Sequence, residues 1–316
     1  MPVVTSDILA LTVAGLKTEF DQAYLLRQQT AEWKYIATEI PTTLPIQNYG
    51  FLGRGAVMEQ FKDRAREQEV NEFTYNLADN TYNANLVIDR KAIEDDQYGL
   101  LMMRVRMLGE EPVRHWNELA YNGLPLGFTT NGYDGSTFFS TSHQEGLSPT
   151  QSNKGVAVLS DAALQTAEAA MMAYVDDKGK PHEIVPDTLV VGPSNARLAT
   201  DLTGSEIIVQ MPGAGTAGTG ATAYTPYNNY FKGRYRVVVS PYLIGSAAAN
   251  WFLIDTKKVI KPIIIQSRSD VPIVVETDML DGHARIREKY SFRARGRYVQ
   301  GFGLWQTAYG STGAGS

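Results

Sequence analysis

Apolar residues recur at helical spacing near the start of the chain. Ser6 or Asp7 can cap the first turn, because each has a side-chain oxygen that accepts a hydrogen bond from a free backbone N–H. The spacing predicts an amphipathic helix of about five turns at roughly 3.6 residues per turn. Its apolar stripe consists of Ile8, Leu9, Leu11, Leu16, Phe20, Tyr24 and Leu25.

A second, longer helix is predicted over 94–122. Asp95 and Asp96 suit the positive end of the helix dipole, and Gly123 is a typical residue to end a helix. Pro112 should bend the helix, because proline removes one backbone hydrogen bond. The apolar faces of this helix are supplied by Leu100, Leu101, Val105, Leu108, Trp116 and Leu119.

Strand patterns fill much of the remaining chain. Two polar, aromatic-rich runs at 73–77 and 82–88 are interpreted as a hairpin that leads into the long helix. A second region combines a helix over 161–174, capped by Ser160, with a buried strand at 188–191 and a short helix that ends at Leu202. Further strands are predicted at 136–139, 234–239, 251–255, 260–266, 272–276 and 285–308, and the tail 309–316 should be loose. The pattern indicates an α+β fold.

Two segments lack the pattern of a packed element. Residues 47–80 begin with glycines and aromatic residues and continue with mixed charges between Glu59 and Glu69. Such a segment cannot bury itself well and is predicted to protrude. Residues 211–220 are rich in glycine and predict a flexible loop.

Composition narrows the function classes. The chain has 316 residues and a formal net charge of −5, which argues against a dedicated nucleic-acid binder held by phosphate contacts. It has no cysteine, which excludes disulfides, thiolate zinc sites and cysteine nucleophiles. No apolar run approaches the ~20 residues that span a bilayer, and no secretory signal is present. We therefore expect a soluble chain that is intracellular at synthesis and keeps its Met1.

No motif predicts catalysis, a metal or a cofactor. Gly213, Gly215 and Gly218 match a dinucleotide fingerprint by letters, but no helix or downstream acid follows. His143 with Glu145, and Asp278 and Asp281 with His283, lack a recognised ligand spacing. We interpret these groups as turn residues with a solvated histidine.

Charged clusters have structural explanations. Glu94, Asp95 and Asp96 are adjacent in sequence and are explained by helix capping, not by paired-carboxylate chemistry. Arg285, Arg287, Lys289, Arg293, Arg295 and Arg297 share one face of a predicted strand. This face could meet DNA, but acidic neighbours in the same sheet are the favoured explanation because the whole chain is acidic.

A set of short sequence blocks resembles a known family. The blocks are Tyr49-Gly-Phe-Leu52, Phe73-Thr-Tyr75, Val87-Ile-Asp-Arg90, Ile93-Glu-Asp-Asp-Gln97 with Gly99, Tyr133-Asp-Gly135 with Phe138-Phe139 and His143, and Leu189-Val-Val-Gly-Pro193. The resemblance extends over about 33–202, and the blocks resemble those of the Mu-like phage and prophage major head subunits, which are tailed-bacteriophage major capsid proteins with the Hong Kong ninety-seven type fold.

The resemblance implies an organisation into five parts. These are an N-terminal arm at 1–46, an extended hairpin loop at 47–80, a peripheral domain at 81–155 with a spine helix at 94–122, an axial domain at 156–261, and strands that return to the peripheral domain with a C-terminal tail at 262–316. Capsids of this fold can carry Lys–Asn cross-links, but a matched asparagine and acid for Lys62 are not identifiable. No scaffold segment is evident, so a separate scaffold protein is expected.

The implied function is assembly. We expect a non-enzymatic head subunit that forms pentamers and hexamers of an icosahedral shell around double-stranded DNA, in the virion, after assembly in the bacterial host cytoplasm. Expected partners are other copies, scaffold and portal proteins, decoration proteins and the packaged DNA by proximity. Alternatives are a tail-tube subunit or a hydrolase using His143 and Glu145. The candidate inter-subunit contact residues are Phe51, Leu52, Val57, Met58, Phe61, Lys62, Arg64, Arg66 and Glu67.

Overall fold

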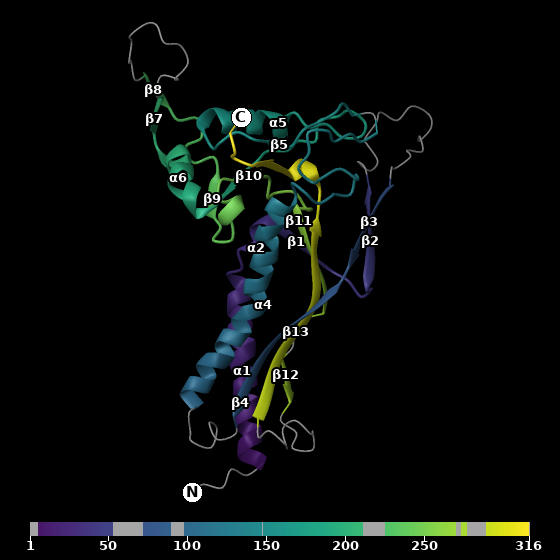
Figure 1. Cartoon of the computed structure of the whole chain (residues 1–316), viewed down its shortest axis with the longest axis vertical. Coiled ribbons are helices and arrows are strands. Elements are labelled where there is room, and N and C mark those ends of the chain that lie inside the picture. The colour runs from purple at the N-terminus through teal and green to yellow at the C-terminus, as the bar shows by residue number, and fades with distance from the viewer. Residues whose placement is uncertain are drawn as a thin grey trace, which may run out of the picture. The chain divides into compact units, whose positions relative to one another are not determined.

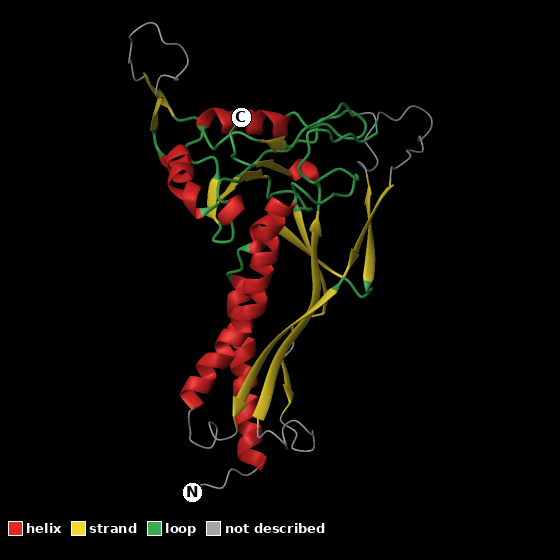
Figure 2. Ribbon diagram, in the orientation of Figure 1, coloured by secondary structure: helices red, strands yellow, loops and turns green. Residues whose placement is uncertain are grey.

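The computed structural model describes residues 6–52, 72–89, 98–146, 148–210, 225–269, 273–276 and 289–315. Figure 1 labels the elements and Figure 2 colours them by type; both show the mixture of helices and strands that the sequence predicts. The α-helices are α1 (Ser6–Gln29), α2 (Trp33–Ile36), α4 (Tyr98–Leu126), α5 (Asp161–Met172) and α6 (Ala196–Gly204), with short 3₁₀ helices η1 (Pro193–Asn195), η2 (Gly245–Ala247) and η3 (Trp305–Thr307). The strands are β1 (Ala37–Pro41), β2 (Ile46–Leu52), β3 (Glu72–Ala78), β4 (Asn80–Asp89), β5 (Lys154–Gly155), β6 (Thr188–Val191), β7 (Ile207–Gln210), β8 (Thr225–Asn228), β9 (Arg236–Val239), β10 (Trp251–Ile254), β11 (Ile263–Ser269), β12 (Ile273–Glu276), β13 (Lys289–Phe302) and β14 (Ala308–Ser311).

The chain divides into two compact units, which we describe separately. Unit 1 consists of Met1–Tyr49, Asn76–Ala120 and Ile264–Gly301, and unit 2 consists of Gly50–Tyr75, Tyr121–Ile263 and Phe302–Ser316. Each unit is therefore assembled from three separate stretches of sequence. The predicted boundaries of arm, loop, peripheral domain and axial domain do not coincide with these units and stay a prediction.

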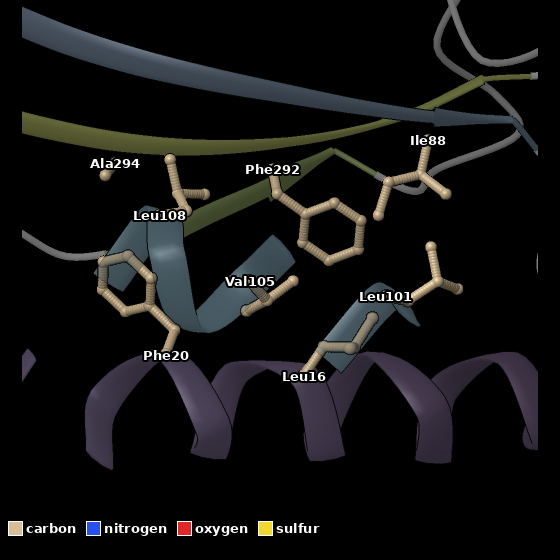
Figure 3. Close-up of a cluster of buried hydrophobic side chains, with 8 residues drawn as sticks. All are labelled: Leu16, Phe20, Ile88, Leu101, Val105, Leu108, Phe292 and Ala294. Carbon is tan, nitrogen blue, oxygen red and sulfur yellow. The ribbon is translucent and has the colours of Figure 1, made fainter. Parts of the chain in front are cut away.

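The core of unit 1 joins two helices to a sheet. Figure 3 shows Leu16 and Phe20 of α1 on one side of α4, with Phe292 of β13 on the other. The α1 stripe is thereby confirmed at Leu16 and Phe20, but Leu25 is exposed and does not belong to it. The buried cluster comprises Leu16, Phe20, Ile88, Leu101, Val105, Leu108, Phe292 and Ala294.

The two strands before the long helix are confirmed, but they do not form a hairpin. β3 pairs with β2, whereas β4 pairs with β13 over ten residue pairs, from Asp89 opposite Lys289 to Asn80 opposite Tyr298. Only Asp79 separates β3 from β4. Because the tightest common hairpins need a two-residue turn, this junction cannot reverse the chain. The unit 1 sheet has the order β1-β11-β13-β12, with β4 also on β13.

The long helix is confirmed with different ends. α4 begins at Tyr98, and residues 94–96 lie outside the described part of the chain. It continues through Pro112 and Gly123 to Leu126, so the predicted stop at Gly123 is wrong. Val113, Trp116 and Leu124 are buried on either side of these residues. Burial of that apolar surface outweighs the weak helix preference of glycine and proline.

Unit 2 is built around a five-stranded sheet in the order β5-β14-β10-β6-β9. β6 and β10 are buried along their whole length, and Ser160 caps α5 by accepting a hydrogen bond from the Ala163 N–H at 3.2 Å, as predicted. The tail is not loose, because β14 lies between β5 and β10 and Ser311 is buried. The predicted strand at 136–139 is only an isolated bridge between Asn131 and Thr137.

Candidate functional site

The predicted contact residues fall mostly outside the described chain. Phe51 and Leu52 are the last residues of β2, and the other seven, Val57, Met58, Phe61, Lys62, Arg64, Arg66 and Glu67, lie within 53–71, which the structure does not describe. The two strands that bracket this segment pair with each other as a separate two-stranded sheet. The prediction that these residues contact other subunits remains untested.

The chain leading into β2 is fixed to the unit 1 sheet. The Tyr49 hydroxyl donates to Gln266 Oε1 at 2.9 Å, and the Thr42 N–H donates to the Ser267 carbonyl at 2.8 Å. Burial raises the pKa of Tyr49 to about 12, so the hydroxyl keeps its proton at neutral pH. Directly after β3, the Asp79 N–H donates to the Pro45 carbonyl at 3.1 Å, and the Asp79 carboxylate lies 3.2 Å from Arg268 Nη1. Hydrogen bonds and an ion pair to β11 thus fix the strands β2 and β3, which lie on either side of the segment 53–71.

The basic strand face pairs partly with acids, as expected. Along β13, Phe292, Ala294 and Tyr298 are buried while Arg295 is exposed, which confirms the predicted two-residue period. Arg297 Nε lies 3.5 Å from Asp79 Oδ2, and Lys289 Nζ lies 3.6 Å from Asp89 Oδ1. These two cations therefore have acidic neighbours within the sheet. Arg285 and Arg287 lie outside the described residues.

His143 is buried, so the prediction of a solvated histidine is wrong. Its Nδ1 lies 2.5 Å from Asp134 Oδ2, and its Nε2 lies 3.0 Å from Asn153 Oδ1. The Asn153 amide nitrogen donates to the Phe138 carbonyl at 2.8 Å, which fixes Oδ1 as the acceptor that faces the ring. The ring also stacks on Trp305 at a centroid distance of 4.2 Å. Both ring nitrogens are therefore occupied by contacts within the protein.

Glu145 is equally enclosed. It accepts hydrogen bonds from the Tyr133 hydroxyl, from Trp305 Nε1 at 2.8 Å and from Gln306 Nε2 at 3.0 Å. Burial and the nearby Glu145 carboxylate raise the pKa of Tyr133 well above its ordinary value. A carboxylate that accepts several hydrogen bonds in a closed core has a structural role and offers no position to a substrate. Asp278, Asp281 and His283 lie outside the described residues.

No metal site is evident in the described residues, where no three histidine or acidic side chains gather to hold an ion. Nor is any helix within that same part of the chain long and apolar enough to cross a membrane.

Two surface features of unit 1 were not predicted from the sequence. Leu100, Met103 and Met107 are exposed on α4, with Met107 70% exposed, so Leu100 does not share the burial of Leu101 and Val105 with which it was grouped. The three exposed residues follow an i, i+3, i+7 spacing on a different face from the buried Leu101, Val105 and Leu108, a second periodic pattern that the sequence already contains. Nearby, Tyr82, His115 and Tyr298 form an aromatic group whose ring centroids lie 4.6 to 5.6 Å apart.

Comparison with known proteins assigns the chain to a family. The family described as the Mu-like prophage major head subunit gpT matches residues 9–158, 155–243 and 235–314. The Mu-like prophage FluMu major head subunit of Haemophilus influenzae is 25% identical over 174 residues, which cover 55% of this chain and only 56% of that protein. The major capsid protein of Escherichia phage Mu is 20% identical over 283 residues, covering 90% of this chain and 67% of that protein.

Solved structures share the fold. The procapsid of bacteriophage JBD30 gives a TM-score of 0.54 at 22% identity, with 97% of this chain and 75% of that chain covered. A virus-like particle from Pyrococcus furiosus gives a TM-score of 0.53 at 10% identity, covering 93% of this chain and 98% of that chain. At these identities the likeness shows the fold alone, which is that of capsid subunits. The family model matches the chain from residue 9 to residue 314, and the shared fold agrees with that match. The chain therefore belongs to the Mu-like prophage major head subunit family.

Proposed function

We propose that the chain is the shell-forming subunit of a tailed-phage head, which assembles into the pentamers and hexamers of an icosahedral capsid around double-stranded DNA. The observation that carries the proposal is the family match from residue 9 to residue 314. The fold shared with the JBD30 procapsid subunit supports it. The shell would be assembled in the host cytoplasm and retained in the virion.

The described geometry suits a subunit that associates through several weak contacts. The segment 53–71 is bracketed by paired strands, and α4 exposes Leu100, Met103 and Met107 to a partner. Standard protein interfaces bury ~1,600 Å² in total, and several such contacts per subunit stabilise an assembly far more than one. Each contact alone stays reversible, so that misplaced subunits can leave the growing shell.

Charge would set the register of these contacts. The nine candidate residues combine apolar anchors, such as Phe51 and Phe61, with charges from Lys62 to Glu67. Apolar anchors supply most of the binding free energy at an interface, whereas charges select the correct partner orientation. Scaffold, portal and decoration proteins are further proposed partners, and packaged DNA would lie near the shell without dedicated phosphate contacts.

The alternatives have little support. A hydrolase would need His143 or Glu145 to face a substrate, yet both are buried and engaged by protein groups. A tail-tube subunit would have a different assembly shape, and the structural likeness is to capsid and virus-like particle subunits. The family is a structural one, in keeping with a non-enzymatic role.

Electron microscopy of the expressed chain tests the proposal. The full chain, produced with a scaffold protein if required, should form closed megadalton shells, and tubes or small oligomers would contradict the assignment. Deletion of 53–69 should leave a folded subunit that no longer closes shells. A second variant replaces 53–69 by a glycine-serine linker of equal length, which keeps the spacing and removes the side chains, and it should also fail to close shells. Normal shells from both variants would refute the role given to this segment.

A further inference from the structure

A small pocket opens in unit 1 between α4 and the paired strands β4 and β13. It has a volume of about 160 Å³, and its aromatic lining consists of Tyr82, His115 and Tyr298. The strand register explains the space, because Ala84 lies opposite Ala294 and Tyr82 lies opposite Gly296. Small residues at these paired positions leave the layer between sheet and helix incompletely filled.

The volume limits what can enter. Pockets for drug-sized molecules usually measure about 300–1,000 Å³, so this one is too small for such a ligand. An engineered apolar cavity of about 150 Å³ in another protein accommodates one benzene molecule. The pocket is therefore the right size for a single flat group, such as one ring or the planar end of one side chain.

The lining favours a flat cation. Tyr82 and Tyr298 stack with ring centroids 4.7 Å apart, and the Tyr298 hydroxyl lies 2.7 Å from His115 Nδ1, which fixes the aromatic group. Aromatic rings attract cations electrostatically. Burial lowers the pKa of His115, so its ring is neutral at neutral pH and does not repel a positive charge.

Glu111 supplies a carboxylate to the same pocket. Its present neighbour is Arg114, whose Nη1 lies 3.5 Å from Glu111 Oε2 across one turn of the helix, with both side chains largely exposed. Such an exposed pair contributes little stability, so Glu111 can turn to a better donor. A guanidinium group both stacks on aromatic rings and binds a carboxylate through two parallel hydrogen bonds, which an ammonium group cannot do.

We propose that this pocket receives the guanidinium group of an arginine from a second copy of the chain. The choice of a second copy rests on the proposed function, because a shell subunit is surrounded by copies of itself. Charge complementarity and planarity select arginine over lysine and over a neutral ring. The pocket would then be a specific inter-subunit contact that is separate from the segment 53–71.

Binding of a model compound tests the pocket without assembly. N-acetyl-arginine amide, titrated into the unassembled full-length subunit, should shift the NMR signals of the His115 ring with an affinity in the millimolar range, about −4 kcal/mol. The lysine analogue should bind more weakly. Glu111→Gln should weaken arginine binding about tenfold, whereas Glu110→Gln, which removes an exposed carboxylate on the same helix that does not line the pocket, should leave it unchanged.

Assembly provides the second readout. Glu111→Gln and the pocket-filling variant Ala84→Leu should lower the yield of shells, while Glu110→Gln should not. Tighter binding of N-acetyl-phenylalanine amide than of the arginine compound would overturn the proposal, as would equal shell yields from all three variants. If the wild type forms no shells at all, the proposed function fails, whereas the arginine titration still decides the chemistry of the pocket.

Discussion

The contact between α1 and α4 can be tested at a single glycine. A methyl group placed on Gly109 would lie 2.7 Å from the Phe20 carbonyl oxygen, 3.1 Å from Ala23 Cβ and 3.4 Å from the Tyr24 nitrogen. The first distance is shorter than a carbon–oxygen contact tolerates, and the obstructing atom belongs to the backbone of α1. Gly109→Ala should therefore force the two helices apart.

Two opposing effects set the magnitude. Alanine is favoured over glycine in a helix interior by about 1 kcal/mol, which acts to stabilise the variant. Overpacking of a tight contact typically costs about 1–3 kcal/mol, so the net result should lie between roughly neutral and about 2 kcal/mol of destabilisation. Gly99, in the first turn of the same helix, has open space around it, so Gly99→Ala retains the helix preference without the clash.

Chemical unfolding of the purified subunit compares the two variants. The free energy of unfolding should be about 1–3 kcal/mol lower for Gly109→Ala than for Gly99→Ala. Amide hydrogen exchange should accelerate in α1 for Gly109→Ala alone, because α1 is held through this contact. Equal stabilisation by both substitutions would show that α1 does not approach α4 at Gly109, and the described core of unit 1 would then be wrong at this point.

Three further results are expected. Asn153→Leu should lower the unfolding free energy of the subunit by roughly 2–6 kcal/mol in denaturant titrations, because it leaves the Ser140 N–H and His143 without their buried partner; a change under about 1 kcal/mol would refute the enclosed network. Ser160→Ala should cost about 1 kcal/mol through loss of the α5 cap, whereas the same substitution at the exposed Ser142 should cost less. Burial lowers the pKa of His115 from its ordinary value of 6.5, so the unfolded chain binds the proton more tightly than the folded chain does. The contribution of the neutral His115 to the free energy of unfolding is therefore fully present above pH 6.5, and it is lost as the pH falls through the lower folded value. His115→Gln should remove that part of the pH dependence of unfolding, and an unchanged pH profile would contradict the assignment.

The sequence predicted the elements better than their pairing. The hydrophobic period identified the long helix and the strands at 188–191 and 251–255, because those segments bury surface on a regular repeat. Pairing depends on residues far apart in sequence. The single residue Asp79 between β3 and β4 excludes a hairpin, but only the partners on β2 and β13 make that visible.

The candidate site was predicted less completely. The sequence blocks include Tyr133, Asp134 and His143, but the sequence did not predict that these residues are buried. Their enclosing partners Trp305 and Gln306 lie some 160 residues later in the chain. The aromatic pocket was missed for the same reason, since Tyr82, His115 and Tyr298 come from three distant segments. The contact residues at 57–67 remain a prediction drawn from the family resemblance.

The position of β14 inside the unit 2 sheet has a consequence for synthesis on the ribosome. The strand occupies a place between β5 and β10, although its residues come near the end of the sequence. Roughly 120 residues separate it from β6, and at about 5–20 residues per second roughly 6–24 s pass before the sheet can be completed. A nascent chain therefore lacks an interior strand until this stretch has emerged. A chain truncated before this stretch would leave β10 without its partner β14, and such an open edge can pair with strands of other chains.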